Sequence, residues 1–239
     1  MGKRQSLPEV DPRCLPVGTR VGPWRVTGFG GLGAYGTLYR VERVGREHLG
    51  PFALKLAVYP GDRRFEREAR LLSSIHSPYV PGLHDQGAWE HASGTYPYLV
   101  MDWIDGEPLY EWAMRRNPSQ RQVLELLAQV ARALVDTHAV GALHRDVKGA
   151  NVLVRRTDGQ AFLIDFGAGD YRGAATLTSK LLPPGTPGYR SPEAWAFLHV
   201  FRRHPTVLYP ASTCDDLFAL GVTAYRLATD KYPPPTHPE

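Results

Sequence analysis

The stretch at residues 143–154, LHRDVKGANVLV, combines two properties that seldom occur together. Its apolar residues have the composition of a buried strand, yet it also carries a histidine, an arginine, a lysine, an aspartate and an asparagine. Isolated buried charges are costly, so a cluster of this kind is normally paired, solvated at a cleft or bound to a ligand. The stretch therefore predicts a polar site built onto a core segment.

Composition favours a globular fold and argues against a nucleic-acid partner. The chain has 239 residues, of which 43% are hydrophobic, and this is enough for one large domain or two smaller lobes. The net charge is +4, but basic and acidic residues alternate, as in RRFEREAR at 63–70, which is a weak signal for nucleic-acid binding. The two cysteines suit a reducing compartment and argue against a disulfide framework.

Hydropathy predicts no membrane span in this sequence. No apolar run reaches the roughly eighteen residues needed to cross a bilayer, and no signal peptide precedes the fold. We therefore expect a cytoplasmic location, either for the chain itself or as the cytoplasmic part of a longer membrane-anchored protein.

The N-terminal part of the chain predicts a small antiparallel sheet with one helix. Residues 1–20 contain several prolines and no periodicity, which indicates a poorly ordered lead-in. Residues 62–75 place apolar side chains three or four positions apart, with Asp62 as a possible helix cap. Strands are expected near 24–29, 36–44, 52–59, 80–89 and 96–104. This first lobe is expected to span residues 21–104.

The C-terminal part, residues 105–239, predicts a mostly helical lobe. Its strongest helix pattern covers 119–140, with Ser119 as the cap and Gly141 as the stop. A second apolar helix is expected near 215–229. Between these helices lie short strands at 151–156 and 161–166 and a Gly-, Pro-, Ser- and Thr-rich segment at 168–192, which is too long for an ordinary connection. The expected fold class is α+β, with a sheet-based lobe and a helical lobe.

Two features of the first lobe are suited to phosphate binding. The glycines of GLGAYG, between two predicted strands, let a backbone approach a phosphate closely, although a flexible hairpin turn would use glycines as well. Lys55 follows two apolar strand residues, and it either snorkels to the surface or pairs with a carboxylate. Glu68, on the predicted helix, could turn toward the sheet and hold Lys55 beside anionic phosphates.

The second lobe offers oxygen ligands for a metal ion. Asp146 and Asn151 lie five positions apart, and Asp165 follows fourteen residues later at the end of another predicted strand. Two carboxylates and an amide would suit Mg²⁺, which prefers such oxygens together with phosphate oxygens. Lys148 would then face a transferred phosphate. In the alternative interpretation, Arg145 and Lys148 merely neutralise Asp146 in a salt-bridged loop.

In their order along the chain, these motifs resemble those of the Hanks-type, or eukaryotic-like, serine/threonine protein kinases, particularly the bacterial ones. The resemblance runs from about residue 24 to the end and rests on GLGAYGTL, FALK, REARLL, HRDVKGAN, DFG and GTPGYRSPE. It implies a bilobal protein-kinase-like fold, with ATP and Mg²⁺ as cofactors. It also implies phosphoryl transfer to a serine or threonine of a protein substrate.

The resemblance assigns a role to each matching position. Asp146 would accept the proton of the substrate hydroxyl, and Lys148 would steady the γ-phosphoryl group. The full catalytic set would be Asp146, Lys148, Asn151, Lys55, Glu68 and Thr186, and the metal ligands would be Asn151 and Asp165. The ATP phosphates would contact Gly31, Gly33, Gly36 and Lys55, and the adenine pocket would include Leu38, Ala53, Met101, Asp102, Ile104 and Leu153.

The resemblance also implies a spine between the lobes and a regulated segment. The spine would consist of Leu72, Leu83, His144 and Phe166, anchored through Asp216. Arg145 precedes the catalytic aspartate, as in kinases that are switched by phosphorylation of the activation segment. A phosphate on this segment would pair with Arg145, and the candidate autophosphorylation sites are Thr176, Thr178 and Ser179.

The sequence departs from the family pattern near its C-terminal end. The family's domain normally continues through several more helices, one of which carries an arginine that pairs with the glutamate of SPE, here Glu193. We therefore expect a truncated second lobe that ends after the helix near 215–229. Two alternatives remain open: a pseudokinase scaffold that binds a partner without catalysis, and a small-molecule phosphotransferase, which typically lacks a segment like GTPGYRSPE.

Overall fold

The computed structural model describes residues 11–33, 35–171, 181–204 and 206–234. The chain divides into two compact units, and each is described by itself. Unit 1 comprises Met1–Ala69 and Gly82–Trp103, and unit 2 comprises Arg70–Pro81 and Ile104–Glu239. Across the described ranges, no helix is both long enough and apolar enough to cross a membrane.

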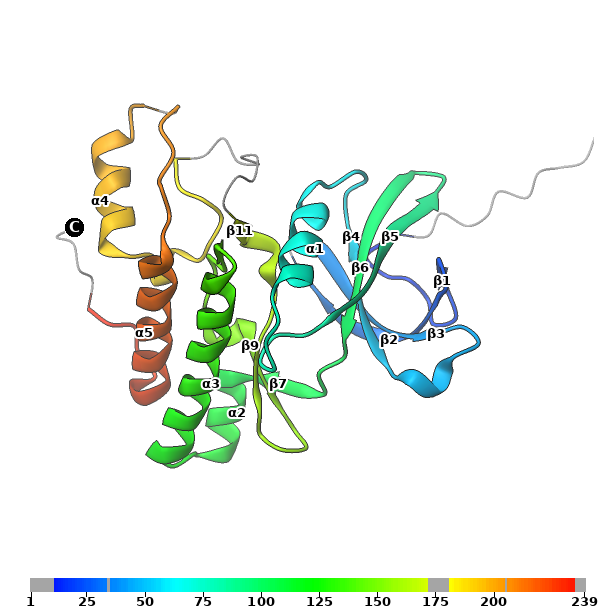
Figure 1. The fold of residues 1–239 in the computed structure, drawn as a ribbon, viewed down its shortest axis with the longest axis horizontal. Coiled ribbons are helices and arrows are strands. Elements are labelled where there is room, and N and C mark those ends of the chain that lie inside the picture. The colour runs from blue at the N-terminus through cyan, green and yellow to red at the C-terminus, as the bar shows by residue number, and fades with distance from the viewer. Residues whose placement is uncertain (1–10, 34, 172–180, 205, 235–239) are drawn as a thin grey trace, which may run out of the picture. The chain divides into compact units, whose positions relative to one another are not determined.

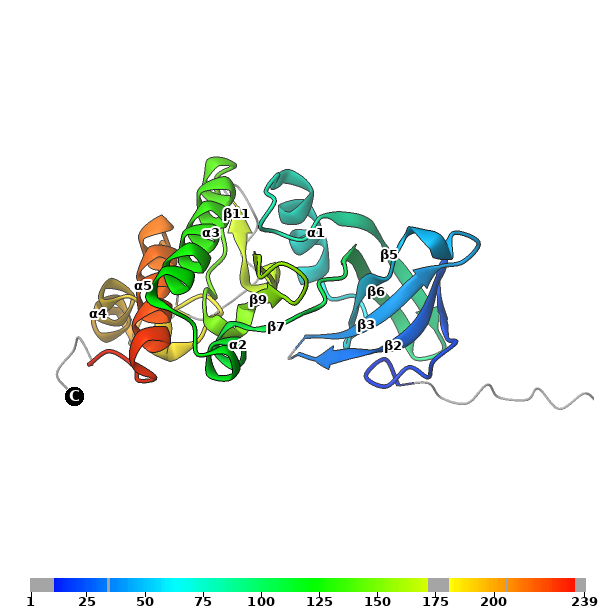
Figure 2. The same cartoon turned by 90° about the horizontal axis from the view of Figure 1, so that it is seen from below.

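Unit 1 is built on a six-stranded antiparallel sheet with the strand order β1-β2-β3-β4-β6-β5 (Figure 1). The strands are β1 (Arg20–Val21), β2 (Trp24–Leu32), β3 (Gly36–Arg43), β4 (Phe52–Ala57), β5 (Leu83–His91) and β6 (Gly94–Asp102), and a 3₁₀ turn (Glu47–Leu49) follows β3. Figure 2 shows the long hairpin of β2 and β3 from below. The five strands predicted from alternation are present, and the two-residue β1 is an addition to them.

The two faces of this sheet bury different side chains. One face packs a core that includes Trp24, Tyr39, Leu54 and Val100, each at most 2% exposed. Against the other face lies α1 (Arg64–Ser74). Phe65 and Ala69 of this helix pack in one cluster with Ala57 and Leu99 of the sheet. Asp62 Oδ1 accepts a hydrogen bond from the Arg64 backbone N–H at 3.0 Å, so the expected cap of this helix is present.

The segment before β1 is packed, in contrast to the poorly ordered lead-in expected over residues 1–20. Leu15 is buried in the core of unit 1, and its backbone N–H donates to the Tyr39 hydroxyl at 2.9 Å. The same hydroxyl donates to the Pro12 carbonyl oxygen at 2.8 Å. Because Tyr39 is 24 residues beyond Leu15, no local pattern reveals this attachment. Residues 1–10 lie outside the described residues.

Within its described residues, unit 2 contains four α-helices, of which α3 is the longest. They are α2 (Leu109–Arg116), α3 (Gln120–Ala139), α4 (Pro192–Phe201) and α5 (Thr213–Thr229). Helices α3 and α5 lie side by side (Figure 1). Ser119 and Gln122 cap α3 reciprocally, as the predicted cap requires, and Gly141 follows with φ of +71°. Helix α4 was not predicted, because its mostly apolar sequence has no clear periodicity.

Short strands and turns of unit 2 position the polar residues that were predicted to form its catalytic and metal sites. Strands β7 (Gly106–Pro108), β9 (Val152–Arg155) and β10 (Ala161–Leu163) form one antiparallel sheet, and β8 (Ala142–Leu143) pairs with β11 (Asp170–Tyr171). Three 3₁₀ turns follow these strands, at Gly149–Asn151, Phe166–Ala168 and Pro187–Tyr189. With a sheet-based unit 1 and a mainly helical unit 2, the predicted α+β class is confirmed.

Candidate active site

Lys55 extends from β4 toward Glu68 on α1. Its Nζ lies 2.8 Å from each carboxylate oxygen of Glu68. The Lys55 side chain is 16% exposed and that of Glu68 is 3% exposed, so both charges are largely shielded from water. A carboxylate this deeply buried is tolerated when it is paired and hydrogen-bonded. The predicted pair is therefore confirmed, and the alternative of a lysine that snorkels to the surface is wrong.

Strand register places four of the predicted nucleotide-binding residues of unit 1 on one face of its sheet. Leu38 lies opposite Lys55 between β3 and β4, and Ala53 lies opposite Met101 between β4 and β6. Residues two apart on a strand share a face, so Ala53 and Lys55 point to the same side. Asp102, which follows Met101 as the last residue of β6, points to the opposite face. The sheet thus presents apolar side chains beside the lysine.

The turn between β2 and β3 has positions that require glycine. Gly31 has φ of +148°, which other residues rarely adopt. A Cβ on Gly36 would lie 3.1 Å from both the Cγ of Lys55 and the ring of Phe65. The Gly33 N–H donates to the Gly36 carbonyl oxygen at 2.9 Å and closes the turn. The absence of side chains therefore lets this backbone pass close to Lys55.

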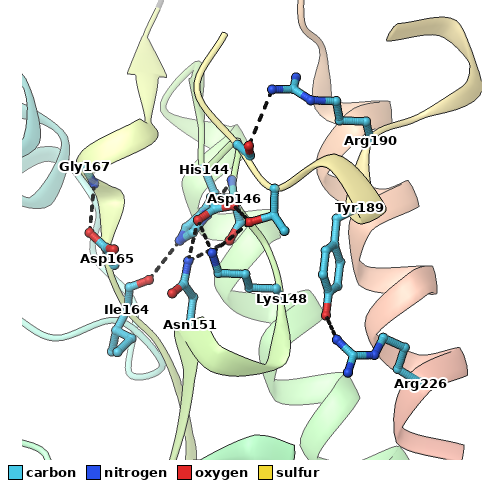
Figure 3. Close-up of polar contacts among 12 residues, drawn as sticks. His144, Asp146, Lys148, Asn151, Ile164, Asp165, Gly167, Tyr189, Arg190 and Arg226 are labelled. Atoms are coloured by element: carbon cyan, nitrogen blue, oxygen red, sulfur yellow. Dashed lines mark hydrogen bonds and ion pairs between the residues drawn. The ribbon is translucent and has the colours of Figure 1, made fainter. Parts of the chain in front are cut away.

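A compact network of hydrogen bonds surrounds the Asp146 carboxylate in unit 2 (Figure 3). Its Oδ2 accepts from Lys148 Nζ at 2.7 Å and from Asn151 Nδ2 at 3.0 Å. Its Oδ1 accepts from Thr186 Oγ1 at 2.7 Å, and Lys148 Nζ also donates to Thr186 Oγ1 at 2.8 Å. We call these four residues the Asp146 network. The structure thus brings together four of the six predicted catalytic residues.

Asp216, in the first turn of α5, holds the backbone before Asp146. Its carboxylate accepts the backbone N–H groups of His144 at 2.9 Å and Arg145 at 2.8 Å. Arg145 has φ of +67°, a left-handed conformation that is costly for a residue with a side chain. Burial opposes ionisation of Asp216, but the hydrogen bonds from His138 and from these backbone groups lower its pKa overall. The ionised carboxylate therefore stabilises the strained turn, which agrees with the anchor expected at Asp216.

His144 connects this turn to the segment that carries Asp165. Its buried ring donates from Nε2 to the Ile164 carbonyl oxygen at 3.0 Å (Figure 3). The ring also contacts Phe166 edge-on, with 4.6 Å between the ring centroids. The Ile164 N–H in turn donates to the Asn151 carbonyl oxygen at 2.9 Å. Asp165 is therefore attached to the same backbone framework as Asn151.

Asn151 and Asp165 offer oxygen atoms that fit a magnesium ion. The Asn151 amide nitrogen donates to the Asp146 carbonyl oxygen at 2.8 Å and to its carboxylate, which directs the amide oxygen away from these acceptors. Asp165 is exposed and has φ of +64°. Within the described ranges, no group of three or more His, Cys, Asp or Glu side chains forms a metal cage. These donors therefore suit Mg²⁺ that also takes oxygens from a bound phosphate.

The remaining predicted residues are distributed over both units and beyond them. Ile104 and Leu153 are half-buried residues of unit 2, whereas the other predicted adenine contacts belong to unit 1. Of the predicted spine, Leu83 belongs to unit 1 and Leu72 to unit 2, and only the contact between His144 and Phe166 is described above. The candidate phosphorylation sites Thr176, Thr178 and Ser179 lie outside the described residues.

Sequence reasoning missed two residues beside the Asp146 network. Asp170 forms an ion pair with Arg145, and His138 donates to Asp216 at 2.9 Å. Asp170 lies in the Gly-, Pro-, Ser- and Thr-rich segment at 168–192, whose sequence has no periodicity that indicates a partner. His138 has helical spacing with the apolar residues of α3, so its polar contact with α5 is visible only once the two helices are packed.

Comparisons with known proteins identify the family of this chain. Residues 26–239 match the family described as "Protein kinase domain". The chain is 35% identical over 172 residues to serine/threonine-protein kinase PknA of Mycobacterium tuberculosis, which covers 71% of this chain and 37% of that protein. It is 33% identical over 238 residues to Pkn1 of Myxococcus xanthus (93% and 32%) and 31% identical over 221 residues to PknE of M. tuberculosis (90% and 36%).

The chain therefore belongs to the protein kinase family, and these relatives are bacterial serine/threonine kinases. Family membership confirms the predicted kinase-like fold class and implies ATP as the nucleotide. The chain spans about a third of the length of the relatives named here.

Proposed function

We propose that this chain transfers the γ-phosphoryl group of ATP to a serine or threonine hydroxyl of a protein substrate. The Asp146 network carries the proposal, because it fixes both oxygens of one carboxylate and places a lysine ammonium 2.7 Å away. A positioned base beside a positive charge is suited to phosphoryl transfer, which depends on placement and charge neutralisation. The names of the bacterial relatives support serine and threonine as acceptors.

Asp146 is the base in this proposal. Thr186 and Asn151 hold its two oxygens from different segments, and 15% of its side chain stays exposed. A substrate hydroxyl that reaches the exposed carboxylate donates its proton to Asp146 as its oxygen bonds to the γ-phosphorus, and the bond from this phosphorus to ADP breaks, so that ADP leaves with the electron pair. Lys148 Nζ, 2.7 Å from Asp146 Oδ2, offsets the negative charge of the transferred group. Thr186 bonds both Asp146 and Lys148, and so it sets their spacing.

The nucleotide is bound by residues of both units in this proposal, and residues 21–104 and 105–239 act as the two lobes of the kinase domain. Lys55, held by Glu68, contacts the α and β phosphates, while the glycine turn supplies backbone N–H groups. The shared sheet face of Leu38, Ala53 and Met101 supports an apolar adenine site. Its further contacts are Asp102, Ile104 and Leu153.

Asn151 and Asp165 are the proposed magnesium ligands. A bound Mg²⁺ neutralises phosphate charge and fixes the orientation of the triphosphate. The chain's own contribution is to orient the ligands: Asp146 accepts both amide hydrogens of Asn151, and the Gly167 N–H approaches Asp165 Oδ1 at 3.4 Å. These contacts aim the oxygens before the metal binds, which reduces the ordering needed on binding.

Autophosphorylation is a further part of the proposal, with Thr176, Thr178 and Ser179 as candidate sites. Arg145 forms an ion pair with Asp170 in the structure. A phosphate on the activation segment carries more negative charge than a carboxylate and would compete with Asp170 for this guanidinium. Exchange of one partner for the other would couple the segment to the turn that carries Asp146.

Transfer of radiolabelled phosphate from ATP to a generic protein substrate tests the proposal. We expect transfer by the wild type and a loss of about 10³-fold for Asp146→Asn, within the range for removal of a general base. The matched control is Asp158→Asn, another aspartate of unit 2, whose partner is Arg155, and it should retain activity. Folded wild-type protein that binds ATP but transfers no phosphate would instead support the pseudokinase alternative.

A further inference from the structure

Arg226 of α5 is surrounded by three tyrosine rings. Its guanidinium carbon lies 4.2 Å from the ring centroid of Tyr232, 4.6 Å from that of Tyr110 and 6.0 Å from that of Tyr189. Its Nη1 donates to the Tyr189 hydroxyl at 2.7 Å (Figure 3) and to the Tyr232 hydroxyl at 3.0 Å. The hydroxyls of Tyr110 and Tyr189 are 2.9 Å apart and share a hydrogen bond. We call these four residues the arginine cage.

The cage is held together without a carboxylate among its described hydrogen-bond partners. Arginine over an aromatic face is favourable, more so when it is shielded from water. Burial raises the pKa of the Tyr189 phenol, and its hydrogen bond with Tyr110 acts in the same direction. Tyr189 therefore stays neutral and can accept from Arg226 while it shares its own proton with Tyr110. The cage needs both the positive charge and the hydroxyls.

Two rings of the cage pack against glycines beside the Asp146 network. A Cβ on Gly149 would lie 2.4–2.7 Å from ring atoms of Tyr110, so only glycine allows this contact. Gly149 lies between Lys148 and Asn151 of the Asp146 network. A Cβ on Gly188 would lie 2.7 Å from the ring of Tyr232. Tyr189 and Gly188 belong to the 3₁₀ turn that directly follows Thr186.

Helix α5 thus contacts both segments of the Asp146 network. Asp216, in its first turn, holds the backbone of the segment that contains Asp146. Arg226 lies ten residues later, about 15 Å along the helix axis, and holds the turn after Thr186. The hydrogen bond between Thr186 and Asp146 joins the two segments that this helix fixes.

We propose that Arg226, acting with Tyr110 and Tyr189, is a positioning residue that sets the turn at Pro187–Tyr189 against the loop at Gly149–Asn151. This inference rests on the proposed function, because it assigns to the cage the alignment of Thr186 and Lys148 with Asp146. The cage does not touch the reacting atoms. Its loss therefore lowers the rate of phosphoryl transfer and leaves the nucleotide affinity in place.

The test compares Arg226→Met, Arg226→Lys and Tyr189→Phe with the wild type. Arg155→Met is the matched control, because its guanidinium also lies over a ring, 4.8 Å from that of Phe162, but contacts neither segment of the site. The measurements are kcat for a protein substrate, the Kd for MgATP, the unfolding midpoint in urea, and hydrogen exchange of the amides at 147–151 and 185–190.

We expect Arg226→Met to lower kcat about tenfold, since small misplacements of reacting groups are costly in rate. Its Kd for MgATP should stay within about twofold. Exchange should be faster at 147–151 and 185–190, and only there. Arg226→Lys should recover most of the rate, because an ammonium can also lie over the rings and donate to both hydroxyls. Arg155→Met should change neither rate nor exchange at these segments.

Unchanged exchange and unchanged kcat in Arg226→Met would overturn the inference. If this variant unfolds, Tyr189→Phe decides, because it removes one hydroxyl and keeps the ring volume; wild-type kcat and exchange in that variant would also overturn it. An inactive wild type contradicts the proposed function instead. The exchange comparison still tests the cage in that case, because it needs no catalysis.

Discussion

The Lys55–Glu68 pair of unit 1 and the Asp146 network of unit 2 are assembled in different ways. Lys55 and Glu68 come from a strand and a helix, and their contact depends on how α1 packs on the sheet through Phe65 and Ala69. Three members of the Asp146 network come from one stretch of six residues, and a tight turn already places them together. The pair is therefore a tertiary contact whose carboxylate is only 3% exposed, whereas the network is largely a local structure whose carboxylate is 15% exposed.

This difference predicts that damage to the pair affects both stability and activity, while damage to the network mainly affects activity. A buried ion that loses its partner retains its desolvation cost, so removal of one member destabilises the fold. In a partly exposed network, water can replace a lost hydrogen bond, so the fold tolerates substitutions of its members better. Substitutions of Lys55 and Thr186 test this contrast, and a substitution of Asp216 tests the anchor of the network; they follow from the largest expected effect to the smallest.

Lys55→Met should have the largest effect. It leaves the 3%-exposed Glu68 carboxylate without its lysine, and we expect a loss of about 3 kcal/mol in the free energy of unfolding. The kcat/KM for ATP should fall about 100-fold, since a phosphate contact is lost. Urea unfolding and steady-state kinetics measure the two effects.

The double variant Lys55→Met/Glu68→Leu separates the effect on stability from the effect on activity. We expect the double variant to recover stability, because both charges are gone, and to keep the reduced kcat/KM of Lys55→Met. Arg64→Met removes another ion pair of α1, that with Asp62, and serves as the control with near-normal kcat/KM. Recovery of activity in the double variant would show that Lys55 acts only through the fold.

Asp216→Asn should cost about 2 kcal/mol in the free energy of unfolding, because it weakens hydrogen bonds to an ionised acceptor. The pKa of Asp216 is lower in the folded protein than its usual value of 3.8. Its stabilising contribution is therefore present above the unfolded-state pKa and is lost as pH falls through the folded-state pKa. The stability difference between wild type and variant should be constant near pH 7 and shrink below about pH 4. A difference that grows on acidification contradicts this assignment.

Thr186→Val should have the smallest effect of the three. It removes the hydrogen bonds to Asp146 and Lys148, and we expect kcat to fall about tenfold with little change in the urea midpoint. Thr186→Ser keeps the hydroxyl and should restore kcat to within about threefold of the wild type. Equal rates for the valine and serine variants would show that this hydroxyl does not align the network.

The contrast between local and tertiary contacts also explains which parts of the fold and site could be predicted from the sequence. Strands, the two main helices and the Ser119 cap follow from local periodicity and turn chemistry, and so does the clustering of Asp146, Lys148 and Asn151. The Lys55–Glu68 pair was foreseeable because helix spacing allows Glu68 to face the sheet. In these cases, the residues that interact are close in sequence or are linked by a regular element.

Contacts between distant segments were not foreseeable. The attachment of Leu15 depends on the Tyr39 hydroxyl, and the arginine cage joins α2, the turn after Thr186 and α5. Arg226 interrupts an apolar helical pattern, and this was the one available signal. A single charged residue in such a helix is consistent with simple exposure, so the pattern alone does not identify tyrosine partners.

The central claim is that Lys55 of unit 1 and Asp165 of unit 2 act on one magnesium nucleotide. Calorimetric titration of ATP with and without Mg²⁺ into wild type, Lys55→Met and Asp165→Asn tests it most directly. We predict that Lys55→Met weakens ATP binding at least about tenfold in both conditions, since it removes a charged phosphate contact. Mg²⁺ should strengthen binding in the wild type and in Lys55→Met but not in Asp165→Asn. Binding of MgATP to Asp165→Asn with wild-type affinity, or to Lys55→Met with wild-type affinity, would contradict the account.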